Sequence, residues 1–202
     1  MQKTTILEMN RLTVDEFHKA EKMPLVVVLD DVRSLYNVGS VFRTADAFRV
    51  KAIYLCGITA TPEQVKAGDG VTIIKDCTLK AAQEIHKTAL GAEESVEWRY
   101  FKTAEEAVKS LKNDGFTVLA VEQAHGSTML GDFKPEWEDD TQGRQYAVVL
   151  GNEVKGVHQE VIDLCHGCLE IPQYGTKHSL NVSVTGGIII WHFACAYTNI
   201  SV

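Results

Sequence analysis

The sequence lacks the long, uninterrupted apolar run that a membrane span requires. Residues 1–17 contain no apolar stretch behind a basic start, so they do not have the pattern of a signal peptide. A length of 202 residues suits one domain with a sizeable core. We therefore expect a single-domain cytoplasmic protein with no membrane partner.

Cysteines are few, and their number is odd. Five are scattered along the chain, which does not suggest a disulfide framework. Cys165 and Cys168 have the CxxC spacing, but no second ligand pair stands at a suitable distance. Plain thiols are the favoured interpretation, with zinc or redox chemistry as the alternatives, and we predict no metal site.

The chain also lacks an excess of positive charge. Its 20 Lys and Arg face 27 Asp and Glu, a net charge of −7, which argues against a nucleic-acid binder that ignores sequence. Six cationic residues nevertheless lie in or beside the motifs described below: Arg33, Arg43, Arg49, Lys51, Lys155 and Lys177. A basic cleft on an acidic body therefore remains compatible with RNA binding.

Two common nucleotide-binding motifs are missing. No GxGxxG follows the first apolar strand pattern, and GxxxxGK[ST] occurs nowhere. The Rossmann and P-loop interpretations therefore fail at the level of motifs.

Short apolar runs alternate with helical patterns along the chain. We expect buried strands at 25–29, 52–57, 95–101, 116–121, 146–150 and 168–171. We expect helices at 37–48, 78–89, 103–113, 158–165 and 179–197. This order predicts an α/β fold with a parallel sheet covered by helices on both faces.

Three further segments complete the expected organisation. Residues 1–22 form an N-terminal extension, and 23–202 form the domain. Residues 126–145 are a long polar connection that we expect at the surface. Ser34 or Asn37 is the expected cap of the 37–48 helix.

Glycine and polar residues follow two of the expected strands. Gly151-Asn152-Glu153 comes directly after the 146–150 run, and Pro172-Gln-Tyr-Gly precedes the last helix. Ligands collect beyond the carboxyl ends of strands in open α/β sheets. Both loops are therefore candidates for holding a ligand with backbone groups, although ordinary turns remain an alternative for either loop alone.

Three segments in order, 37–48, 150–157 and 171–187, resemble the motifs of the SpoU (TrmH-like) family of RNA ribose 2′-O-methyltransferases in the SPOUT superfamily. The resemblance extends from Leu25 to Trp191. It implies methyl transfer from S-adenosylmethionine to an RNA ribose 2′-hydroxyl, with tRNA favoured over rRNA. It also implies a C-terminal deep trefoil knot and a homodimer whose active sites use both subunits.

The resemblance assigns roles to individual positions. Asn37 and Arg43 match the first motif, Glu153 the second, and Ser179 and Asn181 the third, which implies RNA binding and catalysis. The positions that match the family's cofactor contacts are Glu122, Gly151, Ile171 and Leu180.

The reaction itself constrains what these residues do. In-line transfer depends mostly on positioning, and Arg43 is a poor general base because guanidinium remains protonated in proteins. We expect Arg43 to clamp a phosphate in bidentate fashion and so orient the 2′-hydroxyl. Simpler roles remain open: an ion pair for Arg43, a helix cap for Asn37, a first-turn acid for Glu153, and a helix start for Ser179 and Asn181.

Two other functions fit the same sequence less well. One is methylation of an RNA base, and the other is an inactive RNA-binding module of the same fold. The presence of all the polar motif positions disfavours both.

Overall fold

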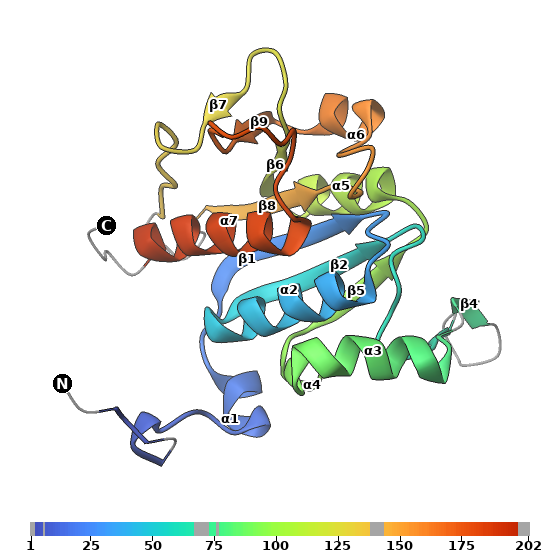
Figure 1. Ribbon diagram of the computed structural model, residues 1–202, viewed down its shortest axis with the longest axis vertical. Coiled ribbons are helices and arrows are strands. Elements are labelled where there is room, and N and C mark those ends of the chain that lie inside the picture. The colour runs from blue at the N-terminus through green and yellow to red at the C-terminus, as the bar shows by residue number, and fades with distance from the viewer. Residues whose placement is uncertain (1–2, 6, 67–72, 76, 138–143, 198–202) are drawn as a thin grey trace.

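A computed structural model describes residues 3–5, 7–66, 73–75, 77–137 and 144–197 (Figure 1). Its centre is a seven-stranded sheet in the order β5-β2-β1-β8-β6-β9-β7, in which every pair of neighbours is parallel. The strands are β1 (Met23–Asp30), β2 (Val50–Cys56), β5 (Trp98–Phe101), β6 (Phe116–Val121), β7 (Thr128–Met129), β8 (Gln145–Leu150) and β9 (Gly167–Glu170). A separate antiparallel pair joins β3 (Val65–Lys66) and β4 (Ile73–Lys75).

Helices cover both faces of the sheet, which confirms the predicted fold class. One face carries α2 (Leu35–Ala47), α3 (Leu79–Ala89), α4 (Ala92–Ser95) and α7 (Val182–Tyr197). The other carries α5 (Ala104–Asn113) and α6 (Gln159–Leu164). Before the sheet come the short helices η1 (Leu7–Met9) and α1 (Val14–Lys19).

The alternation of side chains along each strand builds the two cores. In β1, Leu25 and Val27 point into the core beneath α2 and α7, whereas Val26 and Val28 point into the core beneath α5. All four are at most 1% exposed. A strand that is apolar at every position is therefore explained by burial on both faces.

Several element boundaries differ from the sequence-based expectation, and three of the differences have a clear cause. The cap of α2 is Ser34, one of the two predicted caps, whose hydroxyl accepts the Asn37 N–H at 3.3 Å, so the helix begins at Leu35 rather than at 37. The strand expected from residue 95 begins at Trp98, because Ala92–Ser95 form α4. The last helix begins at Val182 rather than 179, because the Asn181 side chain caps it by accepting the Ser183 N–H at 2.9 Å.

The described part of the 126–145 connection lies largely at the surface, as expected, but it is anchored to the fold at several points. Its residues Thr128–Met129 form β7 beside β9, and Leu130 is buried. Phe133 and Trp137 pack on the core, with Trp137 5.1 Å from the Tyr146 ring centre. Aromatic side chains within a polar stretch thus anchor it, and residues 138–143 lie outside the described part.

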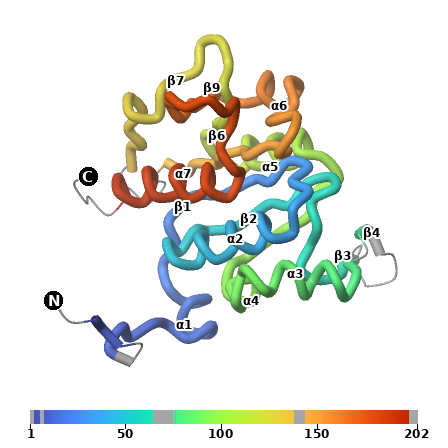
Figure 2. Tube along the Cα trace, in the orientation of Figure 1, coloured from blue at the N-terminus to red at the C-terminus, as the bar shows by residue number. Residues whose placement is uncertain are grey.

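Because the strands of the main sheet are parallel, their carboxyl ends lie together, and this is where a ligand is expected to bind. The carboxyl ends of β1, β8, β6 and β9 lie at one edge of the sheet, where their following loops meet (Figure 1). From β9 the chain returns through 171–181 to α7, which packs beside α2 (Figure 2). Among the described residues, no helix is long and apolar enough to cross a membrane.

Candidate active site

A cavity of about 270 Å³ opens beyond the carboxyl ends of the central strands. Its walls come from the end of β6, the loop after β8 and the segment before α7. All four positions predicted to contact a cofactor line it: Glu122, Gly151, Ile171 and Leu180. The fold therefore brings together residues from three separate parts of the sequence.

The loop after β8, residues 151–157, is closely folded on itself. Asn152 and Gly156 exchange backbone hydrogen bonds of 3.0 and 2.9 Å, and the Asn152 Oδ1 accepts the Val154 N–H at 2.9 Å. A Cβ atom at Gly151 would lie 2.1 Å from the backbone carbon of Gly156. Only glycine fits at position 151, because the obstruction is backbone and cannot rotate away.

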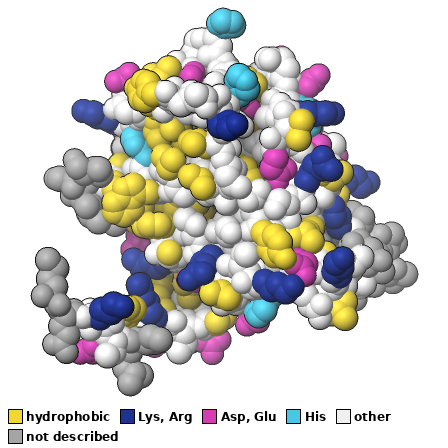
Figure 3. All heavy atoms as spheres, in the orientation of Figure 1, with side chains coloured by type: hydrophobic (Ala, Val, Ile, Leu, Met, Phe, Trp, Pro, Cys, Tyr) yellow, Lys and Arg dark blue, Asp and Glu magenta, His cyan; other side chains and the backbone are white. Residues whose placement is uncertain are grey.

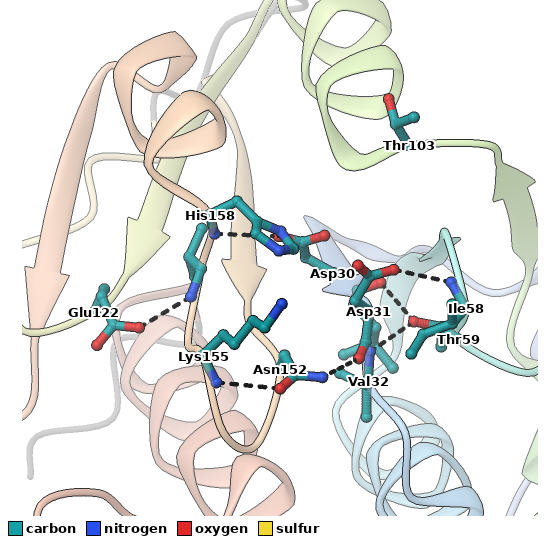
Figure 4. Close-up of polar contacts among 12 residues, drawn as sticks. Asp30, Asp31, Val32, Ile58, Thr59, Thr103, Glu122, Asn152, Lys155 and His158 are labelled. Carbon is teal, nitrogen blue, oxygen red and sulfur yellow. Dashed lines mark hydrogen bonds and ion pairs between the residues drawn. The ribbon is translucent and has the colours of Figure 1, made fainter.

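Glu122 ties this loop to the end of β6. Its Oε2 accepts the Val157 N–H at 3.0 Å (Figure 4). Its Oε1 accepts the Gln123 N–H at 2.9 Å. A carboxylate has about four acceptor sites, so both oxygens can still receive a ligand donor. In this structure Glu122 shapes the cavity wall through backbone contacts.

A polar chain joins the three sequence motifs beside the cavity. Glu153 Oε1 accepts from Asn37 Nδ2 at 3.0 Å, and Asn37 Oδ1 accepts from Asn181 Nδ2 at 3.1 Å. Glu153 also accepts the N–H groups of Arg33 and Ser34, each at 3.0 Å. The Asn37 side chain is buried, so this network fixes its orientation.

The charge of Glu153 is favoured by its contacts. Burial raises the pKa of this carboxyl, but the N–H groups of Arg33 and Ser34 and the Asn37 amide outweigh burial and lower it. Hydrogen bonds to a carboxylate favour the ionised form. Glu153 also lines the cavity, and it therefore places a negative charge at its rim.

Arg43 and Ser179 differ in their distance from the cavity. Ser179 lines it and is exposed. Arg43 is exposed on α2 and does not line the cavity, and its side chain has no hydrogen bond or ion pair to any residue that the structure describes. It lies six positions beyond Asn37, about 9 Å further along the helix axis and on a different side of it. One chain alone thus does not bring Arg43 to the other four motif residues.

A buried pair at the end of β1, Asp30 with His158, was not predicted from the sequence. Asp30 is 3% exposed, and its Oδ2 lies 3.0 Å from His158 Nδ1, just beyond the 151–157 loop (Figure 4). Burial raises the pKa of Asp30, and the hydrogen bond from His158 opposes this in part. The sequence feature that could have indicated this pair is the two acids, Asp30 and Asp31, that directly follow an apolar run.

The neighbouring Asp31 anchors two loops. Its Oδ1 accepts the Ile58 N–H at 2.9 Å, and its backbone oxygen accepts from Asn152 Nδ2 at 2.7 Å (Figure 4). Asp30, Asp31 and His158 present ligand-type atoms within 4.8 Å of one another. The hydrogen bonds of these three residues hold the loops around the cavity, which explains why they lie close together.

Neither cysteine of the CxxC pair lines the cavity. Burial raises the pKa of the Cys165 thiol to about 12 and also raises that of Cys168. Both therefore remain neutral thiols near pH 7, and a neutral thiol is a poor nucleophile and metal ligand.

Known proteins share both sequence and fold with this chain. The model of the SpoU rRNA Methylase family matches residues 65–191. The chain is 28% identical to a tRNA (guanosine(18)-2′-O)-methyltransferase of Aquifex aeolicus, over 92% of this chain and 76% of that protein. It is 26% identical to a 23S rRNA (guanosine-2′-O-)-methyltransferase of Neisseria meningitidis, over 87% of this chain but only 60% of that protein.

Solved structures show the same fold. The A. aeolicus TrmH/SpoU tRNA modifying enzyme superimposes with a TM-score of 0.67 at 23% identity, over 91% of this chain and 79% of that one. An AdoMet-bound rRNA methyltransferase from Sinorhizobium meliloti gives 0.67 at 22% identity, over 92% and 61%. Since the family model covers well over half of the sequence, the chain belongs to the SpoU rRNA Methylase family.

Proposed function

We propose that this protein transfers a methyl group from S-adenosylmethionine to a ribose 2′-hydroxyl of RNA, with tRNA as the favoured substrate and rRNA as the second. The observation that carries the proposal is the Glu153–Asn37–Asn181 network, which joins all three motifs at the rim of one cavity. The A. aeolicus relative, named as a tRNA methyltransferase, supports tRNA.

The cavity fits the proposed cofactor in its chemistry. Gly151, which offers only backbone groups, lines it together with Ile171 and the acidic residue Glu122, which suits a cationic ligand with several hydrogen-bonding groups. When bound, S-adenosylmethionine supplies an activated methyl group on its sulfonium. The 151–157 loop would hold the ligand in a fixed orientation, because its own hydrogen bonds rigidify it.

We assign the polar network the task of orienting the target nucleotide. Glu153 holds Asn37 and the start of α2, and Asn181 is held in turn by Asn37. The exposed Ser179 hydroxyl lies on the cavity wall, where it is available to the ribose. Positioning of this kind supplies most of the rate gain in an in-line transfer.

Arg43 completes the site in this proposal from a second copy of the chain. Its guanidinium would clamp the phosphate beside the target ribose in bidentate fashion and so direct the 2′-hydroxyl at the methyl group. The proton of the hydroxyl then passes to that phosphate or to water. Two copies are needed because Arg43 does not line the cavity of its own chain.

The surface of α7 supports a homodimer. This helix is apolar on nearly every side, and Val184 and Trp191 are 50% and 44% exposed. Hydrophobic side chains gather over α7 on the face that also carries α2 (Figure 3). The ring of Trp191 packs on Phe48 at 5.6 Å, so the apolar surface continues onto the end of α2. Exposed apolar surface of this kind marks an interaction site.

The proposal extends to three features that the resemblance implies. The C-terminal part, from the 151–157 loop to α7, would be threaded as a deep trefoil knot; the return of 171–181 from β9 past that loop to α2 supports this. Residues 1–22 would be an N-terminal extension of the 23–202 domain. The activity would take place in the cytoplasm.

The decisive experiment is a methylation assay. Purified protein is incubated with S-adenosylmethionine carrying a labelled methyl group and, separately, with tRNA and rRNA fractions. After digestion to nucleosides, mass spectrometry should find the label on ribose, with tRNA the better substrate. Label on a base would replace the proposal with base methylation.

Two measurements accompany the assay. Calorimetry should show binding of S-adenosylmethionine without added metal, and failure of this binding would leave only an RNA-binding module. Light scattering should give a dimer; a mass of 22.4 kDa at micromolar concentration would remove the shared site.

A further inference from the structure

The β5 strand leaves one edge of the main sheet open. Glu97 and Phe101 direct their carbonyl groups to β2, accepting the N–H groups of Ile53 at 2.9 Å and Gly57 at 3.1 Å. Backbone groups of successive strand residues point to alternate sides, so Trp98 and Tyr100 direct theirs away from β2. In the part of the chain that the structure describes, no strand pairs with this side of β5.

A hollow runs along this open edge. It has a volume of about 980 Å³ and is lined by the whole of β5, by Val96 and Glu97 before it, and by His18, residues 62–64, Glu93 and Glu94. A four-residue strand is about 13 Å long. The hollow therefore leaves room for a short extended segment beside β5.

The hollow is acidic. Its lining contains four carboxylates and one guanidinium: Glu63, Glu93, Glu94, Glu97 and Arg99. Glu93 uses Oε1 to contact His86 Nδ1 at 2.5 Å, while its Oε2 is buried and has no hydrogen-bond partner among the described residues. Glu93 thus adds a carboxylate to the wall of the hollow, although this one oxygen is closed to solvent and is not itself a contact for a ligand.

We infer that this edge binds an extended, basic segment of a partner protein, which adds to the sheet beside β5. The outward N–H and C=O groups of Trp98 and Tyr100 would pair with its backbone, and its Lys or Arg side chains would meet the four carboxylates. This site lies at the far end of the strand order from β9 and β7, and it is independent of the proposed methyl transfer.

The acidic lining of the hollow favours a basic peptide over RNA and over a second copy of the chain. RNA would bring its phosphates against Glu63, Glu94 and Glu97, which repel them. A second copy pairing through its own β5 would place the same carboxylates opposite each other. A basic peptide alone matches both the backbone edge and the charge.

The first test uses a capped hexapeptide, Lys-Val-Lys-Val-Lys-Val, as the probe. Hydrogen exchange followed by NMR should slow about tenfold or more at the amides of Trp98 and Tyr100 when the peptide binds, since only these two gain partners. The Arg99 amide, which points to β2, should not change. A Glu-Val peptide, or the Lys-Val peptide N-methylated at alternate residues, should leave all three unchanged.

Charge reversal in the chain supplies the second test. The double variant Glu94→Lys with Glu97→Lys should bind the Lys-Val peptide about tenfold more weakly. The control Asp132→Lys with Glu160→Lys makes an equal change in net charge at exposed positions that do not line the hollow, and it should bind normally. Unchanged exchange at Trp98 and Tyr100 at millimolar peptide would overturn the inference. Equal binding of the N-methylated peptide, or preferential binding of oligouridylate along β5, would do so as well.

Discussion

Asn181 Nδ2 donates a 3.1 Å hydrogen bond to Asn37 Oδ1, joining two side chains that are 144 positions apart in the sequence. The same Asn37 donates to Glu153 Oε1, so one buried amide is shared by the other two motifs. An amide that both donates and accepts can bond in this way in one orientation only. The network therefore fixes the geometry of α2, the 151–157 loop and the start of α7 relative to one another.

The role proposed for Arg43 predicts a separation of cofactor binding from catalysis. Arg43→Ala should lower the methyl-transfer rate by about 10²–10³-fold, the usual loss when a transition-state donor is removed. S-adenosylmethionine affinity should stay near normal, because Arg43 does not line the cavity. Single-turnover kinetics and calorimetry measure the two quantities. A loss of cofactor affinity or of folding in this variant would make Arg43 structural.

Arg43→Lys distinguishes a clamp from a base. A point charge does not reproduce a bidentate fork, so we expect little recovery of activity. The deficit relative to the unmodified protein should be similar at every pH, because a clamp does not titrate. A deficit that changes with pH would instead show that the side chain at position 43 gives up a proton in the reaction.

A shared active site predicts complementation between inactive variants. Arg43→Ala and Ser179→Ala should each be nearly inactive alone. Random mixing of equal amounts gives half heterodimers, each with one intact site, so about one quarter of normal activity should return. Each variant mixed with itself is the control. If the mixture stays inactive although light scattering shows that subunits exchange, Arg43 and Ser179 serve the same chain.

The close fold of the 151–157 loop predicts a strong effect of a single methyl group. Gly151→Ala places a Cβ 2.1 Å from backbone, so the loop must move and S-adenosylmethionine affinity should fall about tenfold or more. Gly131→Ala is the matched control, because nothing lies within 4 Å of its added Cβ and its φ is not positive. That variant should keep cofactor affinity and gain about 0.4–1 kcal/mol of stability. Calorimetry and urea unfolding measure both effects.

The lowered pKa of Glu153 predicts how the free energy of unfolding changes at acid pH. Its pKa is lowered in the folded protein, so its contribution is fully present above the ordinary value of 4.5 and is lost as the pH falls through the lowered native value. Glu153→Gln should therefore unfold more easily than the unmodified protein at pH 7, with the difference shrinking toward pH 3. Urea unfolding across this range measures it, and Glu160→Gln is the exposed control.

The pairing of Asp30 with His158 predicts a measurable change in titration. Burial raises the pKa of Asp30 above 3.8, and the hydrogen bond from His158 holds it partly down. His158→Ala removes that bond, so the pKa of Asp30 should rise further. The ¹³C shift of the Asp30 carboxyl reports the titration, with His125→Ala as an exposed control. An unchanged or lower pKa would mean that His158 does not stabilise the charge.

The sequence pattern predicted six of the seven strands of the main sheet, and three motifs predicted the family. Runs such as 25–29 and 146–150 are apolar at every position because both faces are covered, and this pattern is visible without a structure. The four positions that the family resemblance predicts to contact a cofactor all line one cavity. Local signals of this kind are readable because they depend on a few neighbouring residues.

Features that depend on contacts between residues far apart in the sequence were visible only in the tertiary structure. Asn181 caps α7 and bonds to Asn37, so the last helix begins later than its apolar pattern suggests. Trp137 packs on Tyr146 and thereby anchors a segment whose composition is polar. The sequence gives no distance between Arg43 and the cavity, nor between Asp30 and His158, because hydrogen bonds and packing across the fold set both.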